Sequence, residues 1–481
     1  MALRAAQTAR STVPRARRHG RRVRLTTPGP TRRETLRALL RGNLLDSLFD
    51  ASEEYGDLYS WRAGRKAFFM VRAPAHLEHV LVARQDNYVK SFQYRLLAVG
   101  MGEGLLTNEG ESWEKQRRLI QPMFAKRHLA DFASNMTAAI APAMDAWGER
   151  PDGARVDVSE EMTGLTLDVV GRALFGAGLS GEARRIGPAV LEGLRTGVLA
   201  ARLQLAAAPP RWVVDKGRAI FRSPVLTPRL ARFRRSMATI DEVVDRLISE
   251  RQGAMDGAPR DLLGLLLAAR DEGGQGMSRT QVRDEIVTFM LAGHETTANG
   301  LAWMWYLLSL HPEARERMHA EVDEVLGGRV PTADAVDRLV WTSACFQEAI
   351  RLYPPAWVFE REAVEDDALD GHVIPAGSTL LFPSYLIHRD PRMWPNPEAF
   401  DPRRFLPENV HAHPRYAYVP FGAGRRMCVG AGFSIMEATL ITAMIAQRFE
   451  LDLVPGTRVQ AEPTVTLRPR DGLPMTVRKR A

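Results

Sequence analysis

The side chains with the clearest potential for chemistry lie in the loop FGAGRRMCVG, residues 421–430. Cys428 has three glycines close to it, and glycine lets the backbone take a positive φ and approach a flat ligand closely. A helix is predicted near 432–448, so the sulfur would lie just before a helix N-terminus, where amide donors and the positive dipole end favour thiolate. Cys428 is therefore a candidate axial ligand for a metal macrocycle. An inert, packed cysteine is the alternative.

A second set of polar residues, AGHETT at 292–297, falls in the middle of a long predicted helix. Glu295 offers a carboxylate and Thr296 a hydroxyl, which together could bring protons into a dry site. Glycine and threonine are poor helix formers, so their presence here indicates a role beyond that of an ordinary polar cluster. The segment does not complete the zinc motif H-E-x-x-H, because alanine stands where the second histidine would be.

Two further pairs have helical spacing but little specificity alone. Glu348 and Arg351 in EAIR are three residues apart, and Trp113 and Arg117 in WEKQR are four apart. Each pair would share one face of a helix. Most such ion pairs are solvated at the surface, and a tryptophan can simply be part of the core.

Together these segments resemble the cytochrome P450 family over roughly residues 26–480. The loop matches the haem-binding motif F-G-x-G-x-R-x-C-x-G at six fixed positions, which are Phe421, Gly422, Gly424, Arg426, Cys428 and Gly430. AGHETT matches A-G-x-[D/E]-T, EAIR matches E-x-x-R, and WEKQR is similar to W-x-x-x-R, all in the expected order. The resemblance implies a buried structural triad of Glu348, Arg351 and Arg404. The family's P-E-R-F segment reads PRRF here, and Arg403 in place of glutamate should leave that triad intact.

The resemblance also implies a cofactor, haem b, with the Cys428 thiolate as the ligand of its iron. Ala292 and Gly293 would leave room over one face of the haem. The residues expected to bind the haem propionates through charge-assisted hydrogen bonds are Trp113, Arg117, Arg361 and Arg426.

The implied activity is monooxygenation, in which Thr296 and Glu295 deliver protons and one atom of O2 enters the substrate. Electrons from NAD(P)H would come through a ferredoxin or flavodoxin with its reductase, because the 481 residues contain no flavin or iron–sulfur segment. Candidate docking residues on the cysteine side are Lys115, Arg118 and Arg425. A peroxide-driven peroxygenase, which would not need the Thr296 hydroxyl, and a non-catalytic haem sensor are the alternatives.

The substrate is expected to be apolar, such as a terpenoid, a fatty acyl chain or a macrocycle. The family's pocket-lining segments correspond here to residues 92–106, 194–208, 289–297 and 356–359. These segments carry few charges, and their apolar and aromatic residues include Phe92, Tyr94, Leu96, Leu97, Leu203, Leu205, Trp357 and Phe359. Any one of these side chains could instead belong to the core.

The elements that position these residues are mostly helical, with short strands near both ends, which predicts a mainly α fold with small β-sheets. The long central helix over the haem begins with a capping box of Ser278 and Gln281 and ends before His311. Apolar residues on nearly all its faces and a length of roughly 48 Å predict that it crosses the interior. Residues 91–110 are predicted to form a loop. Other helices are expected near 112–121, 127–148, 158–176, 182–204, 229–252, 312–326 and 339–353.

Composition limits the class of protein. The net charge of +8 comes from eight arginines in the first 24 residues, so we expect a basic, disordered arm at 1–25, a cytochrome P450 domain at 26–481 and no nucleic-acid binding. A transit peptide or a membrane- or partner-binding arm is the alternative. No apolar run is long enough for a transmembrane anchor. The two cysteines, Cys345 and Cys428, suit a reducing compartment, and we expect a cytoplasmic monomer.

Overall fold

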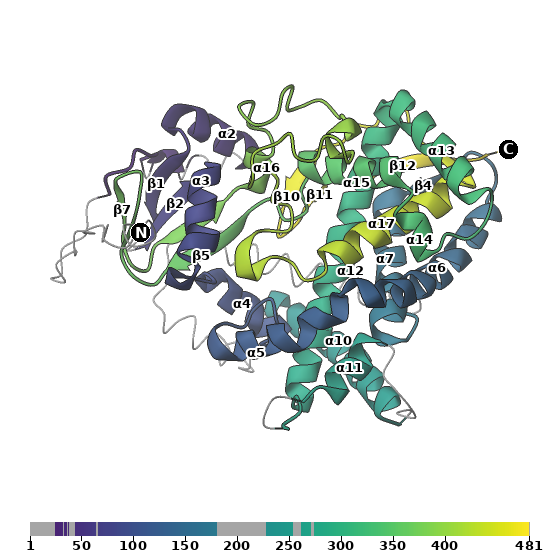
Figure 1. The fold of residues 1–481 in the computed structure, drawn as a ribbon, viewed down its shortest axis with the longest axis horizontal. Helices are drawn as coiled ribbons and strands as arrows, with labels where there is room; N and C mark the ends of the chain where they lie inside the picture. The colour runs from purple at the N-terminus through teal and green to yellow at the C-terminus, as the bar shows by residue number, and fades with distance from the viewer. Residues whose placement is uncertain are drawn as a thin grey trace, which may run out of the picture.

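The computed structural model describes residues 25–31, 33–35, 37, 44–63, 66–179, 228–253, 261–270 and 274–480. Nearly all of the arginine-rich arm and the helix expected at 182–204 lie outside these residues. The described part is mostly helical with small sheets, as the sequence predicts. Figure 1 shows the strands β1, β2 and β5 gathered on one side and most of the long helices on the other.

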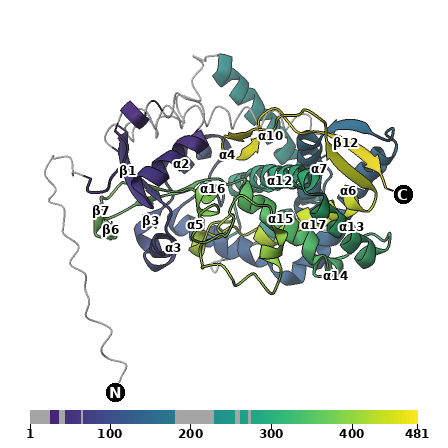
Figure 2. The ribbon, with the colours of Figure 1, turned by 90° about the horizontal axis from the view of Figure 1, so that it is seen from above.

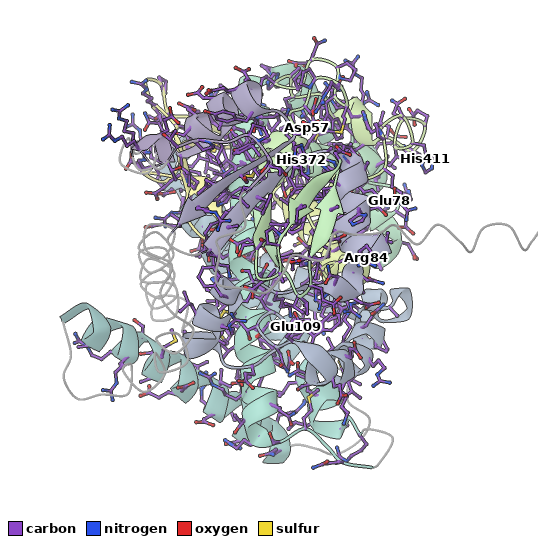
Figure 3. All side chains as sticks on the ribbon, turned by 90° about the vertical axis from the view of Figure 1, so that its left-hand side faces the viewer. Asp57, Glu78, Arg84, Glu109, His372 and His411 are labelled. Carbon is purple, nitrogen blue, oxygen red and sulfur yellow. The ribbon has the colours of Figure 1, made fainter. Side chains whose placement is uncertain are left out.

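The β structure forms four small sheets. A five-stranded sheet has the order β1-β2-β8-β5-β3, a three-stranded sheet has the order β4-β12-β9, and β6-β7 and β10-β11 are separate pairs. Figure 3 looks onto the β-rich side of the molecule. The strands are β1 (Leu58–Ala63), β2 (Lys66–Val71), β3 (Tyr88–Val89), β4 (Ala154–Asp157), β5 (Phe359–Ala363), β6 (Asp367–Leu369), β7 (His372–Ile374), β8 (Thr379–Phe382), β9 (Phe449–Leu453), β10 (Ala461–Pro463), β11 (Leu467–Pro469) and β12 (Pro474–Lys479).

The helices agree closely with those expected from apolar periodicity. Those at 112–121, 127–148, 158–176, 229–252, 312–326 and 339–353 are confirmed within one or two residues at each end. The helices are α2 (Leu44–Tyr55), α3 (Pro74–Glu78), α4 (Phe92–Met101), α5 (Gly110–Ile120), α6 (Lys126–Gly148), α7 (Val158–Phe175), α10 (Pro228–Gly253), α11 (Leu262–Ala268), α12 (Arg279–Leu310), α13 (Pro312–Leu326), α14 (Ala333–Val336), α15 (Val340–Leu352), α16 (Ser384–Ile387) and α17 (Ala431–Ala446).

The central helix α12 has 32 residues and the predicted capping box, in which the side chains and backbone amides of Ser278 and Gln281 bond reciprocally. It packs against α7, α15 and α17, and Figure 2 shows it running through the middle of the helical half. The prediction that it crosses the interior is confirmed. No helix among the described residues is both long enough and apolar enough to cross a bilayer.

The loop predicted for residues 91–110 is wrong in its first half, which forms α4 (Phe92–Met101). Ser91 caps this helix, because its hydroxyl accepts from the Gln93 amide at 3.3 Å. Gly102 ends it with a φ of +80°, a conformation that favours glycine. The glycines that suggested a loop therefore mark the end of a helix.

The predicted triad is confirmed and lies in the core. Arg351 donates from Nε and Nη2 to the two carboxylate oxygens of Glu348, at 2.7 and 2.8 Å, and both residues are fully buried. Arg404 Nε lies 3.4 Å from Glu348 Oε1. Arg403 points outward and pairs with Asp401 at 2.7 Å. The departure at Arg403 therefore changes only a surface charge.

Candidate functional site

The loop that carries Cys428 runs from the single helical turn η5 (Gly424–Arg426) to α17. The Cys428 amide donates to the Phe421 carbonyl at 2.9 Å, which closes the loop, and the side chain is solvent-accessible. Gly424 has a φ of +68°, and a Cβ there would lie 1.9 Å from the Leu81 carbonyl oxygen. Only glycine fits this position.

The surroundings of Cys428 have opposing effects on the pKa of its thiol. Although the residue is solvent-accessible, the protein atoms around the sulfur partly desolvate it and raise the pKa of the thiol, while the Gly430 amide and the positive charge of Arg117 oppose the rise. Arg117 lies beside the loop, where its Nη1 donates to the Met427 carbonyl at 2.7 Å and its Nε to Gln121 at 3.0 Å. As the sequence predicts, an amide at the helix N-terminus favours the thiolate, and burial acts against it.

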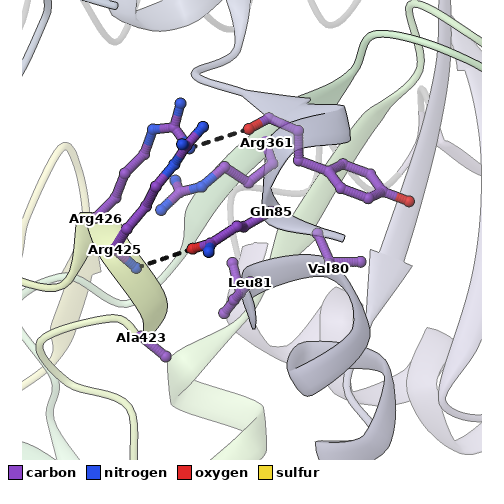
Figure 4. Close-up of a pocket in the computed structure, with 8 residues that line it drawn as sticks. Val80, Leu81, Gln85, Arg361, Ala423, Arg425 and Arg426 are labelled. Atoms are coloured by element: carbon purple, nitrogen blue, oxygen red, sulfur yellow. Dashed lines mark hydrogen bonds between the residues drawn. The ribbon is translucent and has the colours of Figure 1, made fainter. Parts of the chain in front are cut away.

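Cationic side chains converge next to this loop (Figure 4). Arg426 donates from Nη1 to the Tyr88 carbonyl at 3.1 Å and pairs with Glu109, but its buried Nε has no hydrogen-bond partner among the described residues. Arg361 is buried as well, and its Nη1 donates to the Glu360 carbonyl at 2.7 Å. Two buried guanidinium groups beside one ionised partner can bind further carboxylates. The hollow here is lined by Val80, Leu81, Gln85, Tyr88, Arg361, Ala423, Arg425 and Arg426.

Trp113 belongs to the same cluster. Its buried ring lies 5.0 Å from the Arg426 guanidinium and 5.3 Å from the Lys90 ammonium. Lys90 donates to the Leu105 carbonyl at 2.8 Å, and burial lowers the pKa of Lys90 to about 7 although Glu109 opposes the change. No motif in the sequence marks Lys90 or Glu109, and only the fold brings them to the predicted residues.

The middle of α12 presents an accessible face although the helix is buried on either side of it. Ala292 is exposed, while Met290 and Thr297 are buried. Gly293 lies against α7, where a Cβ would be 3.1 Å from Cγ2 of Val170. The structure thus gives Gly293 a packing reason, and the room for a ligand lies at Ala292.

The polar side chains on this stretch of α12 form hydrogen bonds with different parts of the structure. The Thr296 hydroxyl donates to the Ala292 carbonyl at 2.7 Å. Glu295 Oε1 accepts from the Thr466 hydroxyl at 2.7 Å, and burial raises the pKa of Glu295. Thr297 turns toward α17 and bonds to a serine there at 3.1 Å. Glu295 is therefore the acidic group of this stretch, and Thr466 is a contact that the sequence did not reveal.

Several residues expected to line a substrate pocket are part of the core. Trp357 and Phe92 are buried, each in its own apolar cluster. Phe359 stacks on Phe382 with ring centroids 5.1 Å apart. The segment 194–208, with Leu203 and Leu205, lies outside the described residues. Among the expected pocket-lining segments that the structure describes, the stretch around Ala292 has an exposed residue in the middle of a helix.

The residues present fit a haem. Cys428 supplies an accessible sulfur, and the unpartnered Nε of Arg426 lies in a buried cluster suited to carboxylates. The loop and α12 meet at Phe124, whose ring lies 5.6 Å from that of Phe289 and 4.0 Å from where a Cβ of Gly430 would be. A thiol, a cationic cluster and an accessible helix face are the three contacts that an iron macrocycle with carboxylate side chains needs.

Comparison with known proteins gives consistent matches. The family model described as Cytochrome P450 matches residues 27–473. A protein of Mycobacterium tuberculosis whose name assigns it to the same family is 40% identical over 439 residues, which are 90% of this chain and 94% of that protein.

Two similar proteins of Streptomyces melanosporofaciens have names that describe reactions. Cyclooctatin synthase is 36% identical, over 86% of this chain and 87% of its own. Cyclooctat-9-en-7-ol 5-monooxygenase is 34% identical, over 84% of each chain.

Proposed function

This chain belongs to the cytochrome P450 family and is a monooxygenase of that class, and we propose that it oxygenates an apolar, carbocyclic substrate with electrons from a separate ferredoxin or flavodoxin and its reductase. The observation that carries the proposal is Cys428, an accessible thiol in a glycine-shaped loop beside a buried cationic cluster. The cytoplasmic location and the monomeric state inferred from the sequence stay predictions.

The roles of individual residues follow from their positions. Haem held by Cys428 would supply the oxygen chemistry, with one atom of O2 entering the substrate and the other leaving as water. Arg361 and Arg426 would bind the haem carboxylates through charge-assisted hydrogen bonds, with Trp113 packed against them. Glu295 and Thr296 would hold and pass protons on the accessible side of α12, where burial keeps the pKa of Glu295 raised.

The substrate class is supported by the chain's own residues and by one relative. Ala292, the exposed residue in the middle of α12, is apolar, and Phe289 lies one turn before it. The Streptomyces monooxygenase at 34% identity is named for cyclooctat-9-en-7-ol, a cyclic alkenol. We therefore place a carbocyclic terpenoid before the fatty acyl and macrocyclic classes.

The first experiment is the carbon-monoxide difference spectrum of the dithionite-reduced protein beside a Cys428→Ser variant. A strongly red-shifted Soret band that the variant lacks would support the thiolate ligand. A band of the imidazole type that the variant retains would overturn the assignment of Cys428.

A second experiment tests the reaction and the substrate. Turnover is measured with NAD(P)H, ferredoxin and reductase, and separately with hydrogen peroxide, on a cyclic terpenoid alcohol, a fatty acid and a macrolide. Oxygenation of the terpenoid alcohol that depends on NAD(P)H is the expected result. Oxidation only with added peroxide would favour a peroxygenase, and turnover of the fatty acid alone would overturn the substrate class.

A further inference from the structure

The hydroxyl of Thr466 links the catalytic stretch of α12 to the turn between β10 and β11. Thr466 Oγ1 lies 2.7 Å from Oε1 of Glu295 and 3.2 Å from Nδ2 of Asn299. The Asn299 amide nitrogen can only donate, so the Thr466 oxygen accepts from it and the hydroxyl hydrogen is directed to Glu295. The orientation of the Thr466 hydroxyl is therefore set by a residue one helical turn beyond Glu295.

The turn that carries Thr466 is held rigidly by hydrogen bonds to its surroundings. The indole of Trp357 donates to the Thr464 carbonyl at 2.9 Å, and the indole of Trp303, on α12, donates to the Leu467 carbonyl at 3.1 Å. Within the turn, the Thr464 hydroxyl donates to the Thr466 carbonyl at 2.7 Å. Thr466 itself is 6% exposed. The hydrogen bonds of the turn thus fix the position of the Thr466 hydroxyl beside Glu295.

The direct hydrogen-bond partner of Glu295 is the Thr466 hydroxyl, and the nearest charged group acts on Glu295 only from a distance. Burial raises the pKa of Glu295, and the Thr466 hydrogen bond and the positive charge of Arg468 oppose the rise. Arg468 does not contact Glu295, because its guanidinium is paired with Glu462 across the hairpin at 2.8 Å. Among the described residues no hydrogen bond to Oε2 of Glu295 is found. Oε2 is therefore the oxygen at which a proton can enter and leave.

We propose that Thr466 is a positioning residue for proton delivery. Its hydroxyl donates a hydrogen bond to Oε1 of Glu295, so that the carboxyl group keeps one orientation and the exchangeable proton resides on Oε2. The inference rests on the proposed role of Glu295. It assigns to the C-terminal β10–β11 turn a function in the reaction, through a contact between residues 171 positions apart in the chain. Without the hydroxyl the carboxyl group would rotate, and protons would reach the reacting oxygen less often.

The test compares Thr466→Val with the unaltered holoenzyme in the NAD(P)H-driven assay. Valine keeps the shape of the side chain and removes the donor. The product formed per NAD(P)H should fall about three- to tenfold, the effect of one hydrogen bond, while released hydrogen peroxide increases. Thr466→Ser, which restores the donor, should recover the coupling. The carbon-monoxide spectrum and the dissociation constant of the substrate should stay unchanged.

Two controls separate this inference from a structural effect. Thr476→Val makes the same change on β12, in the sheet with β4 and β9, and should keep full coupling. In the background of Glu295→Gln, Thr466→Val should have no further effect on coupling, because the two residues act as one unit.

The outcomes also separate this inference from the proposed function. If the unaltered enzyme shows no NAD(P)H-driven turnover, the proposed function fails. If it turns over with good coupling and Thr466→Val matches it, the role of Thr466 is overturned while the function stands. A variant that loses substrate affinity but keeps its coupling would likewise place Thr466 in the pocket wall and contradict a role in proton delivery.

Discussion

Glu348 and Glu295 are both glutamates on helices of the core, but their surroundings differ. Glu348, on α15, is fully buried and accepts two hydrogen bonds from Arg351 and one from the Asp401 amide, with Arg404 close by. Glu295, on α12, accepts from one neutral hydroxyl, and the nearby Arg468 is paired elsewhere. One carboxylate is surrounded by charged donors, and the other is almost without them.

The difference shows how one residue type serves two purposes in one protein. A buried carboxylate with charged donors on both oxygens is fixed in place, and removing its charge leaves its partners uncompensated. Arg351 extends this fixed region, because its Nη1 also donates to the carbonyls of His388 and Pro397 at 2.7 and 2.8 Å. Burial raises the pKa of both carboxyl groups, but the one with a single neutral donor has no charged partner to hold it ionised and can exchange a proton. The partners of each glutamate, more than its burial, indicate its role.

The same substitution at each glutamate tests this comparison, and Glu348→Gln should have the largest effect. It leaves the buried guanidinium of Arg351 without a counter-charge, so the free energy of unfolding should fall by about 3–5 kcal/mol. Denaturant unfolding at pH 7 measures the loss. Arg403→Gln, which breaks only a surface pair, should leave the midpoint unchanged. A Glu348→Gln protein as stable as the original would contradict the assigned structural role.

Glu295→Gln should affect activity rather than stability. The amide keeps the hydrogen bond from Thr466 but cannot exchange a proton, so the rate of coupled turnover should fall on the order of a hundredfold. The free energy of unfolding should change by less than about 1 kcal/mol, because no charged partner is left behind. Single-turnover product formation and denaturant unfolding on the same preparation measure both. A loss of stability like that of Glu348→Gln would remove the distinction between the two sites.

His388 should make the fixed region sensitive to acid. Its Nδ1 lies 3.1 Å from the Arg351 carbonyl and its Nε2 accepts from the Val419 amide at 2.9 Å, so the buried ring is neutral. Burial and the nearby charge of Arg351 lower the pKa of His388 to about 3. The unfolded chain then binds this proton first, so the contribution of His388 to stability is complete above pH 6.5 and is lost as the pH falls from 6.5 toward 3.

The measurement is the free energy of unfolding as a function of pH for the original protein and for His388→Gln. Between pH 6 and pH 4 the original should lose up to about 1.4 kcal/mol per pH unit more than the variant, since one proton is involved. Parallel pH profiles would show that His388 is not the titrating group.

The extent to which sequence reveals these sites depends on the distance between partners along the chain. Glu348 and Arg351 are three residues apart, so helical spacing predicts their contact. The helix α12 is predictable from its capping box and from the apolar residues on nearly all its faces. Thr466 and Glu295 are 171 residues apart, and neither end carries a pattern that points to the other. The cationic cluster beside Cys428 is predictable only in part for the same reason: motifs mark Trp113 and Arg426, and only the fold brings Lys90 to them.

Short-range signals were also misread where composition outweighed position. The glycines between 91 and 110 hid α4, although Ser91 and Gly102 stand at its two ends as a cap and a terminator. The family resemblance places Trp357 in a pocket-lining segment and leaves a core role open, and in the structure its indole reaches the β10–β11 turn. Apolar residues of pocket and core have the same composition, so only packing separates them.

A third buried glutamate, Glu437 on α17, should give the smallest effect of the series. It is 0% exposed, and neither carboxyl oxygen has a hydrogen-bond partner among the described residues. Burial raises the pKa of Glu437 well above its usual range. The side chain is therefore a neutral acid at low and moderate pH, and Glu437→Gln replaces one neutral group by another of nearly the same shape.

At pH 5 the free energies of unfolding of Glu437→Gln and the original protein should agree within about 1 kcal/mol. Because the folded state holds this proton more tightly than the unfolded chain, the stability that it contributes is complete below pH 4.5 and is lost as the pH rises toward the folded-state pKa. Glutamine does not titrate, so the variant should become the more stable protein as the pH increases. A variant that is less stable at every pH would mean that Glu437 is ionised and paired as Glu348 is, and burial without charged donors would then not distinguish the glutamates of this fold.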